Sequence, residues 1–154
     1  MSIVEILKEK LSSLNPEISE GKGFVSVKVE KDGLKQTARI LRELGFDHVK
    51  TVTAIDYPKE NEFEIIYHAS SFLNEELAKY IIELRTRIPR DKPEIETLTD
   101  IWSSAEFPER ETFEFFGITF KGHPDLRPIL LLPEVVDKKP LRKDFVVKEE
   151  GIFR

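Results

Sequence analysis

The spacing of apolar residues in the first third of the chain predicts two helices with a strand between them. The first helix follows a capping box at residues 2–5, and Pro16 ends it. The second helix is capped by Asp32 and closed by Gly45. Between them, apolar and polar residues alternate over residues 24–29, which predicts a strand. The helical apolar positions are Ile3, Ile6, Leu7, Leu11 and Leu14 in the first helix and Leu34, Ala38, Leu41 and Leu44 in the second.

Three further segments, rich in β-branched and aromatic residues, predict strands over residues 48–57, 63–72 and 80–88. Short polar turns join these segments in series, which favours an antiparallel meander. We therefore expect an α+β fold, with a four-stranded, mostly antiparallel sheet and helices packed on one face of it.

The end of the chain has a different character. Residues 131–154 show no sustained core periodicity, and six of the nine prolines lie between Pro93 and Pro140. We expect a single α+β domain over residues 1–133 and an extended tail over residues 134–154. A segment with so few apolar residues contributes little to a core, so we expect it to become ordered by docking on another protein.

A short helix that ends at Gly117 combines charged and aromatic residues. It begins either at a capping box of Ser103 and Glu106 or at Pro108. At about 100° per residue, one face carries Glu109, Phe113 and Phe116, a second carries Arg110 and Glu114, and a third carries Glu111 and Phe115. Aromatic residues on opposite sides indicate a helix held between its own core and a partner, although a solvated charged face is the alternative.

One carboxylate of this helix, Glu109, falls in its apolar stripe. A buried carboxylate is costly without a cation or several hydrogen-bond donors. Arg127 lies at the end of the following turn, so we expect a buried ion pair between Glu109 and Arg127.

The turn His123-Pro124-Asp125 permits three interpretations. His123 and Asp125 could bind a metal together with a glutamate, or the tripeptide could be that of a J-domain co-chaperone. In the third interpretation Pro124 fixes the turn, Asp125 binds the turn amides and His123 anchors the loop. The metal site lacks a second nearby histidine, and no basic helix precedes the turn as it does in a J-domain.

Composition removes several classes of function. The chain has 154 residues, a net charge of −5, no cysteine and three histidines. Acidic charge argues against nucleic-acid binding, and the lack of cysteine removes iron–sulfur ligation and thiol catalysis. No glycine-rich phosphate loop is present, and no apolar run is long enough to cross a bilayer. The low Gln and Met content and the high Lys and Glu content are typical of a thermophile.

Two motifs at matching spacing resemble those of the thirty-kilodalton subunit of respiratory complex I, which membrane-bound NiFe hydrogenases share. Weaker matches occur upstream, at residues 53–57, 66–68 and 102–105. The sequence departs from the family pattern at Phe113-Glu114, at Pro128 and in residues 135–139, which indicates a divergent branch. The two motifs are Glu109-Arg110-Glu111 continuing through Glu114-Phe115-Phe116-Gly117-Ile118, Gly122-His123-Pro124-Asp125-Leu126-Arg127 and Ile129-Leu130, and Pro140-Leu141-Arg142-Lys143-Asp144-Phe145.

The resemblance implies a cofactor-free structural subunit in the peripheral arm of a complex I-like energy-converting oxidoreductase, without catalytic activity of its own. Its implied partners are a large catalytic subunit similar to the NiFe hydrogenase large chain and other peripheral-arm subunits, including iron–sulfur subunits. The implied location is the cytoplasmic face of the cell membrane, reached indirectly through the complex. We favour a membrane-bound hydrogenase or a relative; the alternative is the corresponding subunit of an NADH- or F(420)H(2)-quinone-type dehydrogenase.

A rival of another class is a small free-standing metal-dependent enzyme that uses Glu111, His123 and Asp125; it would show turnover or bound metal when purified alone. Under the favoured interpretation the site residues fall into two groups. The partner interface comprises Arg110, Glu111, Phe115, His123, Asp125, Arg127, Leu141, Arg142 and Phe145, and the structural group comprises Glu109, Phe113, Phe116, Gly117 and Pro124.

Overall fold

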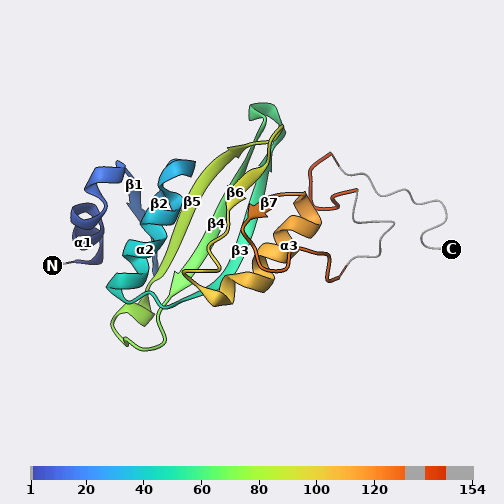
Figure 1. Ribbon diagram of the computed structural model, residues 1–154. Coiled ribbons are helices and arrows are strands. Elements are labelled where there is room, and N and C mark those ends of the chain that lie inside the picture. The colour runs from blue at the N-terminus through green and yellow to red at the C-terminus, as the bar shows by residue number, and fades with distance from the viewer. Residues whose placement is uncertain (1, 131–137, 145–154) are drawn as a thin grey trace.

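The computed structural model describes residues 2–130 and 138–144 and has an α+β fold (Figure 1). The helices are α1 (Ile3–Lys10), α2 (Leu34–Leu44) and α3 (Glu106–Phe116). The strands are β1 (Glu17–Glu20), β2 (Phe24–Lys28), β3 (His48–Tyr57), β4 (Glu62–Ser70), β5 (Ile81–Pro89), β6 (Glu94–Glu96) and β7 (Thr119–Lys121). Short 3-10 turns occupy Ser12–Leu14, Lys31–Gly33, Pro58–Glu60, Leu77–Lys79 and Ser103–Ala105.

The main sheet has five strands in the order β1-β2-β5-β4-β3, one more than we expected. The antiparallel meander of β3, β4 and β5 is confirmed. The additional strand is β1, which pairs with β2, and β2 in turn pairs parallel with β5. Only Ile18 of β1 is partly buried, so its sequence carries no alternating pattern. Strands β6 and β7 form a separate parallel pair.

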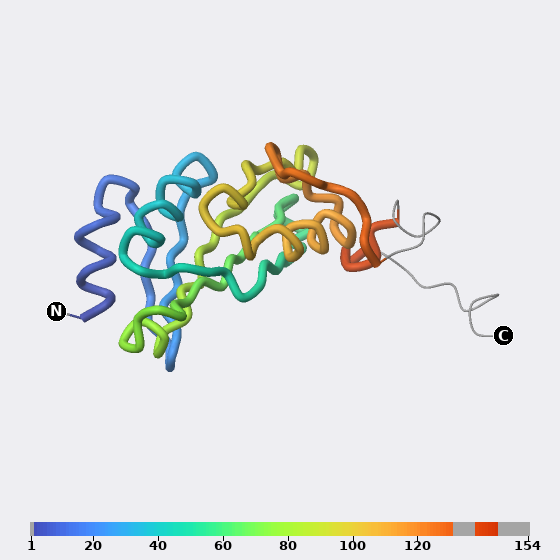
Figure 2. Tube along the Cα trace, turned by 60° about the horizontal axis from the view of Figure 1, so that its bottom comes forward, coloured from blue at the N-terminus to red at the C-terminus, as the bar shows by residue number. Residues whose placement is uncertain are grey.

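The core lies on one face of the sheet. The register aligns Val27 of β2, Leu84 of β5 and Tyr67 of β4 in one row, and all three side chains are buried. Helices α2 and α3 lie over this face, whereas α1 lies at the β1 end and adds Leu7 and Leu11 to the core (Figures 1 and 2). The opposite face carries charged residues of β4 and β5, such as the ion pair between Glu64 and Arg85.

The sequence predicted both N-terminal helices, but α1 ends at Lys10, a 3-10 turn occupies Ser12–Leu14 of the predicted span, and one cap was misassigned. Ser2 and Glu5 form the expected capping box of α1, and Gly45 closes α2 in the left-handed conformation. Asp32 does not cap α2; it belongs to the 3-10 turn that leads into the helix, and Gly33 occupies the cap position without a side-chain hydrogen bond.

Helix α3 begins with Glu106, and the expected capping box of Ser103 with Glu106 does not form. The hydroxyl of Ser104 instead accepts the N–H of Val49 at 2.8 Å and donates to its carbonyl at 3.0 Å, which fastens the start of the helix to β3. Gly117 ends the helix as expected: its φ is 78°, and its N–H donates to the carbonyl of Phe113 at 2.8 Å.

Candidate functional site

The inner face of α3 is fixed by the carboxylate of Glu109, which is fully buried. The hydroxyl of Tyr67 donates to it at 2.7 Å, the N–H of Leu98 donates at 3.0 Å, and the hydroxyl of Thr97 donates to its other oxygen. Burial raises the pKa of Glu109 and outweighs the opposing effect of these hydrogen bonds. Three neutral donors therefore hold α3 to β4 and to the loop after β6.

The expected ion pair between Glu109 and Arg127 is wrong. The side chain of Arg127 is 71% exposed and binds Asp125 at 2.9 Å. Donors from three separate residues replace the expected cation, and such a set satisfies a buried carboxylate without a second buried charge.

Arg110 and Glu114, which share the second face of α3, bind the segment that follows the helix. The buried guanidinium of Arg110 donates from Nε to the carbonyl of Arg127 at 3.1 Å and lies 3.6 Å from Asp125. The carboxylate of Glu114 accepts the N–H groups of Ile129 and Leu130 at 2.9–3.1 Å. This face of the helix therefore holds residues 125–130 against the domain.

His123 anchors the turn, as the structural interpretation predicted. Its Nε2 atom lies 2.9 Å from the carbonyl of Glu106, and its Nδ1 atom accepts the N–H of Asp125 at 3.0 Å. Because the carbonyl can only accept and the amide can only donate, these bonds fit a neutral ring protonated at Nε2. The predicted role of Asp125 was wrong, since its carboxylate binds Arg110 and Arg127 and not the turn amides. Pro124 lies exposed in the turn.

The third face of α3 borders a groove of about 330 Å³ beside β3. Here the structure brings together three of the predicted interface residues: Glu111 is exposed, Phe115 is half-buried, and Leu141 is 55% exposed. The lining residues are Thr51, Val52, Thr53, Ala54, Glu111, Thr112, Phe115, Phe116 and Leu141. Phe116 is buried and meets the ring of Phe63 edge-on, as expected for the core side of the helix, whereas Phe113 is only partly buried.

Residues 138–144, the described part of the predicted tail, contact the domain itself. Arg142 donates from Nε to the carbonyl of Phe116 at 2.7 Å, and the N–H of Leu141 donates to the carbonyl of Phe115 at 3.2 Å. The side chains of Lys139 and Arg142 lie next to Gly117. Phe145 lies outside the described residues. The docking of residues 134–154 on a partner stays a prediction.

A buried ion pair that the sequence analysis missed lies under this segment. Arg90 binds Asp56 through two hydrogen bonds of 2.9 and 3.0 Å, and the N–H of Lys143 donates to the same carboxylate at 2.9 Å. Arg90 also lies 3.1 Å from Asp144. Burial opposes ionisation of Asp56, but the bonds from Arg90 and Lys143 outweigh it and lower the pKa of Asp56. The sequence could have indicated this pair, because Asp56 is a charged residue at a position of β3 that faces the core.

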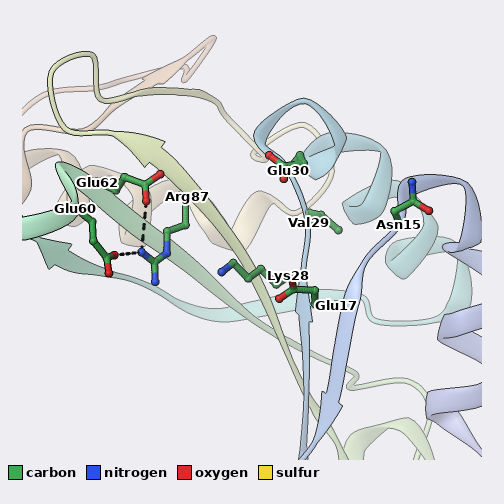
Figure 3. A pocket seen from close by; sticks show the side chains of 8 residues that line it. All are labelled: Asn15, Glu17, Lys28, Val29, Glu30, Glu60, Glu62 and Arg87. Carbon is green, nitrogen blue, oxygen red and sulfur yellow. Dashed lines mark hydrogen bonds and ion pairs between the residues drawn. The ribbon is translucent and has the colours of Figure 1, made fainter.

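A second hollow, of about 500 Å³, is lined by residues of β1, β2, β4 and β5 and of the turns next to them (Figure 3). In Figure 3 the guanidinium of Arg87 lies between the carboxylates of Glu60 and Glu62, with which it is ion-paired. The hollow is lined by Asn15, Glu17, Lys28, Val29, Glu30, Glu60, Glu62 and Arg87. Arg87, the arginine of this hollow, is already paired with carboxylates of the chain. Across residues 2–130 and 138–144, no group of three or more His, Asp or Glu side chains is arranged to hold a metal.

Comparison with known proteins adds to this geometry. Residues 27–151 match the family described as "Respiratory-chain NADH dehydrogenase, 30 Kd subunit". The chain is 40% identical over 118 residues to the C subunit of the F(420)H(2) dehydrogenase of Methanosarcina mazei, covering 76% of this chain and 72% of that one. It is 36% identical over 146 residues to the C subunit of the NADH-quinone oxidoreductase of Moorella thermoacetica, covering 93% and 95%.

Two solved structures share the fold. A chain of the membrane-bound sulfane sulfur reductase, an archaeal respiratory membrane complex, aligns with a TM-score of 0.78 and 33% identity over 92% of this chain and 84% of that one. A trypsin-resistant fragment of Nqo5 aligns with a TM-score of 0.69 and 28% identity over 82% and 100%. No helix among the described residues is both long and apolar enough to span a membrane. On the matched family and these relatives, the chain belongs to the family of the 30-kilodalton subunit of respiratory-chain NADH dehydrogenase.

Proposed function

We propose that this chain is a cofactor-free structural subunit in the peripheral arm of a complex I-like energy-converting oxidoreductase. In this proposal it clasps the large catalytic subunit through α3 and the segments that follow it. Contacts with iron–sulfur subunits of the arm and an indirect association with the cytoplasmic face of the membrane belong to the same proposal. Its support is family membership, because the relatives are named as subunits of an F(420)H(2) dehydrogenase and of an NADH-quinone oxidoreductase, and as part of a respiratory membrane complex.

The observation that carries the proposed interface is the distribution of exposed apolar side chains. Among the described residues, seven large hydrophobic side chains are exposed, and four of them belong to α3 or to the segments after it: Phe107, Ile129, Leu130 and Leu141. Contiguous exposed apolar patches mark interaction sites, and Leu141 of this group borders the groove beside α3. Aromatic and arginine anchors with an apolar surround are the usual composition of such sites.

The polar groups around these side chains support the same conclusion. Three side chains form hydrogen bonds within the chain itself: Arg110, His123 and Glu114. We therefore propose that they shape the surface and do not contact the partner. The groups left facing outward include Glu111, the guanidinium of Arg127 and the four exposed apolar side chains. We therefore propose these six together with Phe115 as the contact residues, and we assign Arg110, His123 and Asp125 to shaping the surface.

The test is copurification of the assembled complex from cells that carry a tagged chain. Leu130→Ser and Leu141→Ser should each reduce the recovered large subunit, by about tenfold or more if they are interface anchors. Phe24→Ser is the matched control, because Phe24 is also an exposed hydrophobic side chain but lies on β2. Equal recovery of the large subunit with all three variants and the wild type would contradict the proposal.

The names of the relatives help to distinguish between the candidate complexes to which we propose that the chain belongs. The sequence alone favoured a hydrogenase, with a dehydrogenase as the alternative. The similarities to an F(420)H(2) dehydrogenase subunit and to a sulfane sulfur reductase chain support a dehydrogenase or sulfur-reducing relative instead. The sequence of the copurified large subunit separates them. Two Cys-x-x-Cys pairs would provide the thiolates of a NiFe centre and indicate a hydrogenase, and their loss would indicate a dehydrogenase or sulfur-reducing relative.

A further inference from the structure

The loop between β4 and β5 exposes two adjacent large hydrophobic side chains. Phe72 is 78% exposed and Leu73 is 91% exposed, the highest values among the large hydrophobic residues that the structure describes. Ser71 separates the two residues from the end of β4, and neither is used by the α3 interface proposed above. We refer to Phe72 and Leu73 as the hydrophobic tip.

The backbone of the tip is held in place by a single carboxylate. Asp47 accepts the N–H of Phe72 at 3.0 Å, the N–H of Leu73 at 3.1 Å and the hydroxyl of Ser71 at 3.3 Å. Burial opposes its ionisation, but the hydrogen bonds from His48 and the two amides outweigh that effect and lower the pKa of Asp47 to about 2. Asp47 is therefore ionised at neutral pH, and it fixes the loop by charge-assisted hydrogen bonds.

The ring of Phe72 is fixed as well. It stacks on the imidazole of His48 with ring centroids 3.5 Å apart and an interplanar angle of 4°. One face of the Phe72 ring is covered by this stack, and its exposure shows that the rest is open to solvent. An aromatic side chain that is already held in one orientation loses little entropy on binding, which is the property of a preorganised anchor.

The tip lies far from the Leu141 end of the α3 surface. In Figures 1 and 2 the yellow-green loop between β4 and β5 occupies the end of the molecule near α2, whereas residues 138–144, in red, lie at the opposite end. A partner docked on residues 138–144 and the C-terminal end of α3 would therefore leave the tip uncovered. The tip is therefore a separate candidate for a contact.

The charge of the loop distinguishes a protein from a membrane as the partner of the hydrophobic tip. The loop carries Glu75, Glu76 and Lys79, and Lys79 is paired with Glu76 at 3.2 Å, so its net charge is negative. Anionic lipid surfaces attract basic segments and would repel this loop. An apolar pocket rimmed by Lys or Arg on another protein would match both the apolar tip and its acidic surround.

We propose that the hydrophobic tip docks into an apolar pocket with a basic rim on another subunit of the complex, as a second contact independent of the α3 surface. This proposal rests on the proposed function, because it requires the chain to be part of a complex. The natural chain contains no cysteine, so Leu73→Cys creates a single thiol at the tip. A maleimide reagent should label this thiol readily in the free chain and lose that reaction in the assembled complex. Lys22→Cys, in the exposed turn between β1 and β2, is the control and should be labelled in both.

A second variant tests whether the contact matters for assembly. Leu73→Ser should fold normally, because the side chain is almost fully exposed, yet weaken copurification of the protein it contacts by about tenfold or more. Equal labelling of Leu73→Cys in the free chain and in the complex would overturn the proposal. So would protection by anionic phospholipid vesicles alone, or by concentration of the pure chain, since these assign the tip to a membrane or to a second copy. Loss of the large subunit with Leu141→Ser is scored separately, so either surface can fail while the other stands.

Discussion

At the scale of one residue, the first prediction concerns how the stability of the protein depends on pH through Glu109 and its three hydrogen-bond donors. Because burial raises its pKa, the folded state binds a proton more readily than the unfolded state does. Its contribution to stability is therefore greatest below its ordinary pKa of 4.5 and is lost as the pH rises through the folded-state pKa. Glu109→Gln removes this titration while keeping an acceptor oxygen for Tyr67 and Leu98.

We expect the stability of the wild type relative to Glu109→Gln to fall as the pH is raised from about 4 to 7. Urea unfolding at several pH values measures this difference directly. Glu111→Gln, at the exposed neighbouring position, is the control and should show little pH-dependent difference. A difference for Glu109→Gln that did not change with pH would show that the carboxylate has an ordinary pKa.

The pair of Asp56 and Arg90 makes the second residue-scale prediction. Arg90→Met removes both hydrogen bonds to a carboxylate that is 2% exposed, and leaving a buried charge without its partner costs about 3–5 kcal/mol. Lys79→Met is the control: it removes an ion pair with Glu76 that is exposed on both sides, and it should cost under about 1 kcal/mol. Chemical denaturation of both variants checks this, and similar losses would mean that Asp56 is relaxed by solvent once Arg90 is gone.

At the scale of an element, the prediction concerns the contribution of residues 138–144 to the stability of the domain. The sequence alone assigns residues 134–154 to a tail that contributes little to folding, which predicts an unchanged melting temperature after truncation. The observed contacts predict otherwise, because cutting after Pro133 removes the Arg142 bond to the end of α3 and the Lys143 bond to Asp56. Each lost hydrogen bond costs about 1 kcal/mol, so we expect the melting temperature to fall by several degrees, at about 2–4 °C per kcal/mol.

The control for this truncation is a cut after Asp144, which keeps every described contact of the segment. Thermal melts of the full chain and of both truncations, recorded side by side, make the comparison. A chain cut after Pro133 that melts with the full-length protein would restore the interpretation of residues 134–154 as a tail that serves only a partner.

At the scale of the whole molecule, the sheet links the two proposed contacts. The parallel pairing of β2 with β5 joins the N-terminal elements to the antiparallel meander, so α2, the hydrophobic tip and α3 are held by one hydrogen-bonded sheet. A contact at the tip and a contact at α3 would therefore fix the relative position of the proteins that make them. This role needs a rigid body with two surfaces and no catalytic group, which is the function proposed for the chain.

The sequence by itself determined the features that depend on neighbours along the chain. Helix spacing, strand alternation and the left-handed stop at Gly117 are local, and the structure contains them where they were expected. The two long motifs also indicated the family to which the chain belongs. The position of Glu111, Phe115 and Leu141 on one groove followed partly from helical periodicity, because two of the three share a helix face.

Only the tertiary structure decided which distant residues meet. β1 has no alternating pattern and exists because β2 offers it a free edge, and β2 pairs with β5 across more than fifty residues of intervening chain. Glu109 finds its donors on β4 and after β6, and Asp56 finds Arg90 beyond β5, so neither partner could be read from spacing. A charged residue at a buried position indicates that a partner is required, but the packing of the elements around it determines which group is that partner.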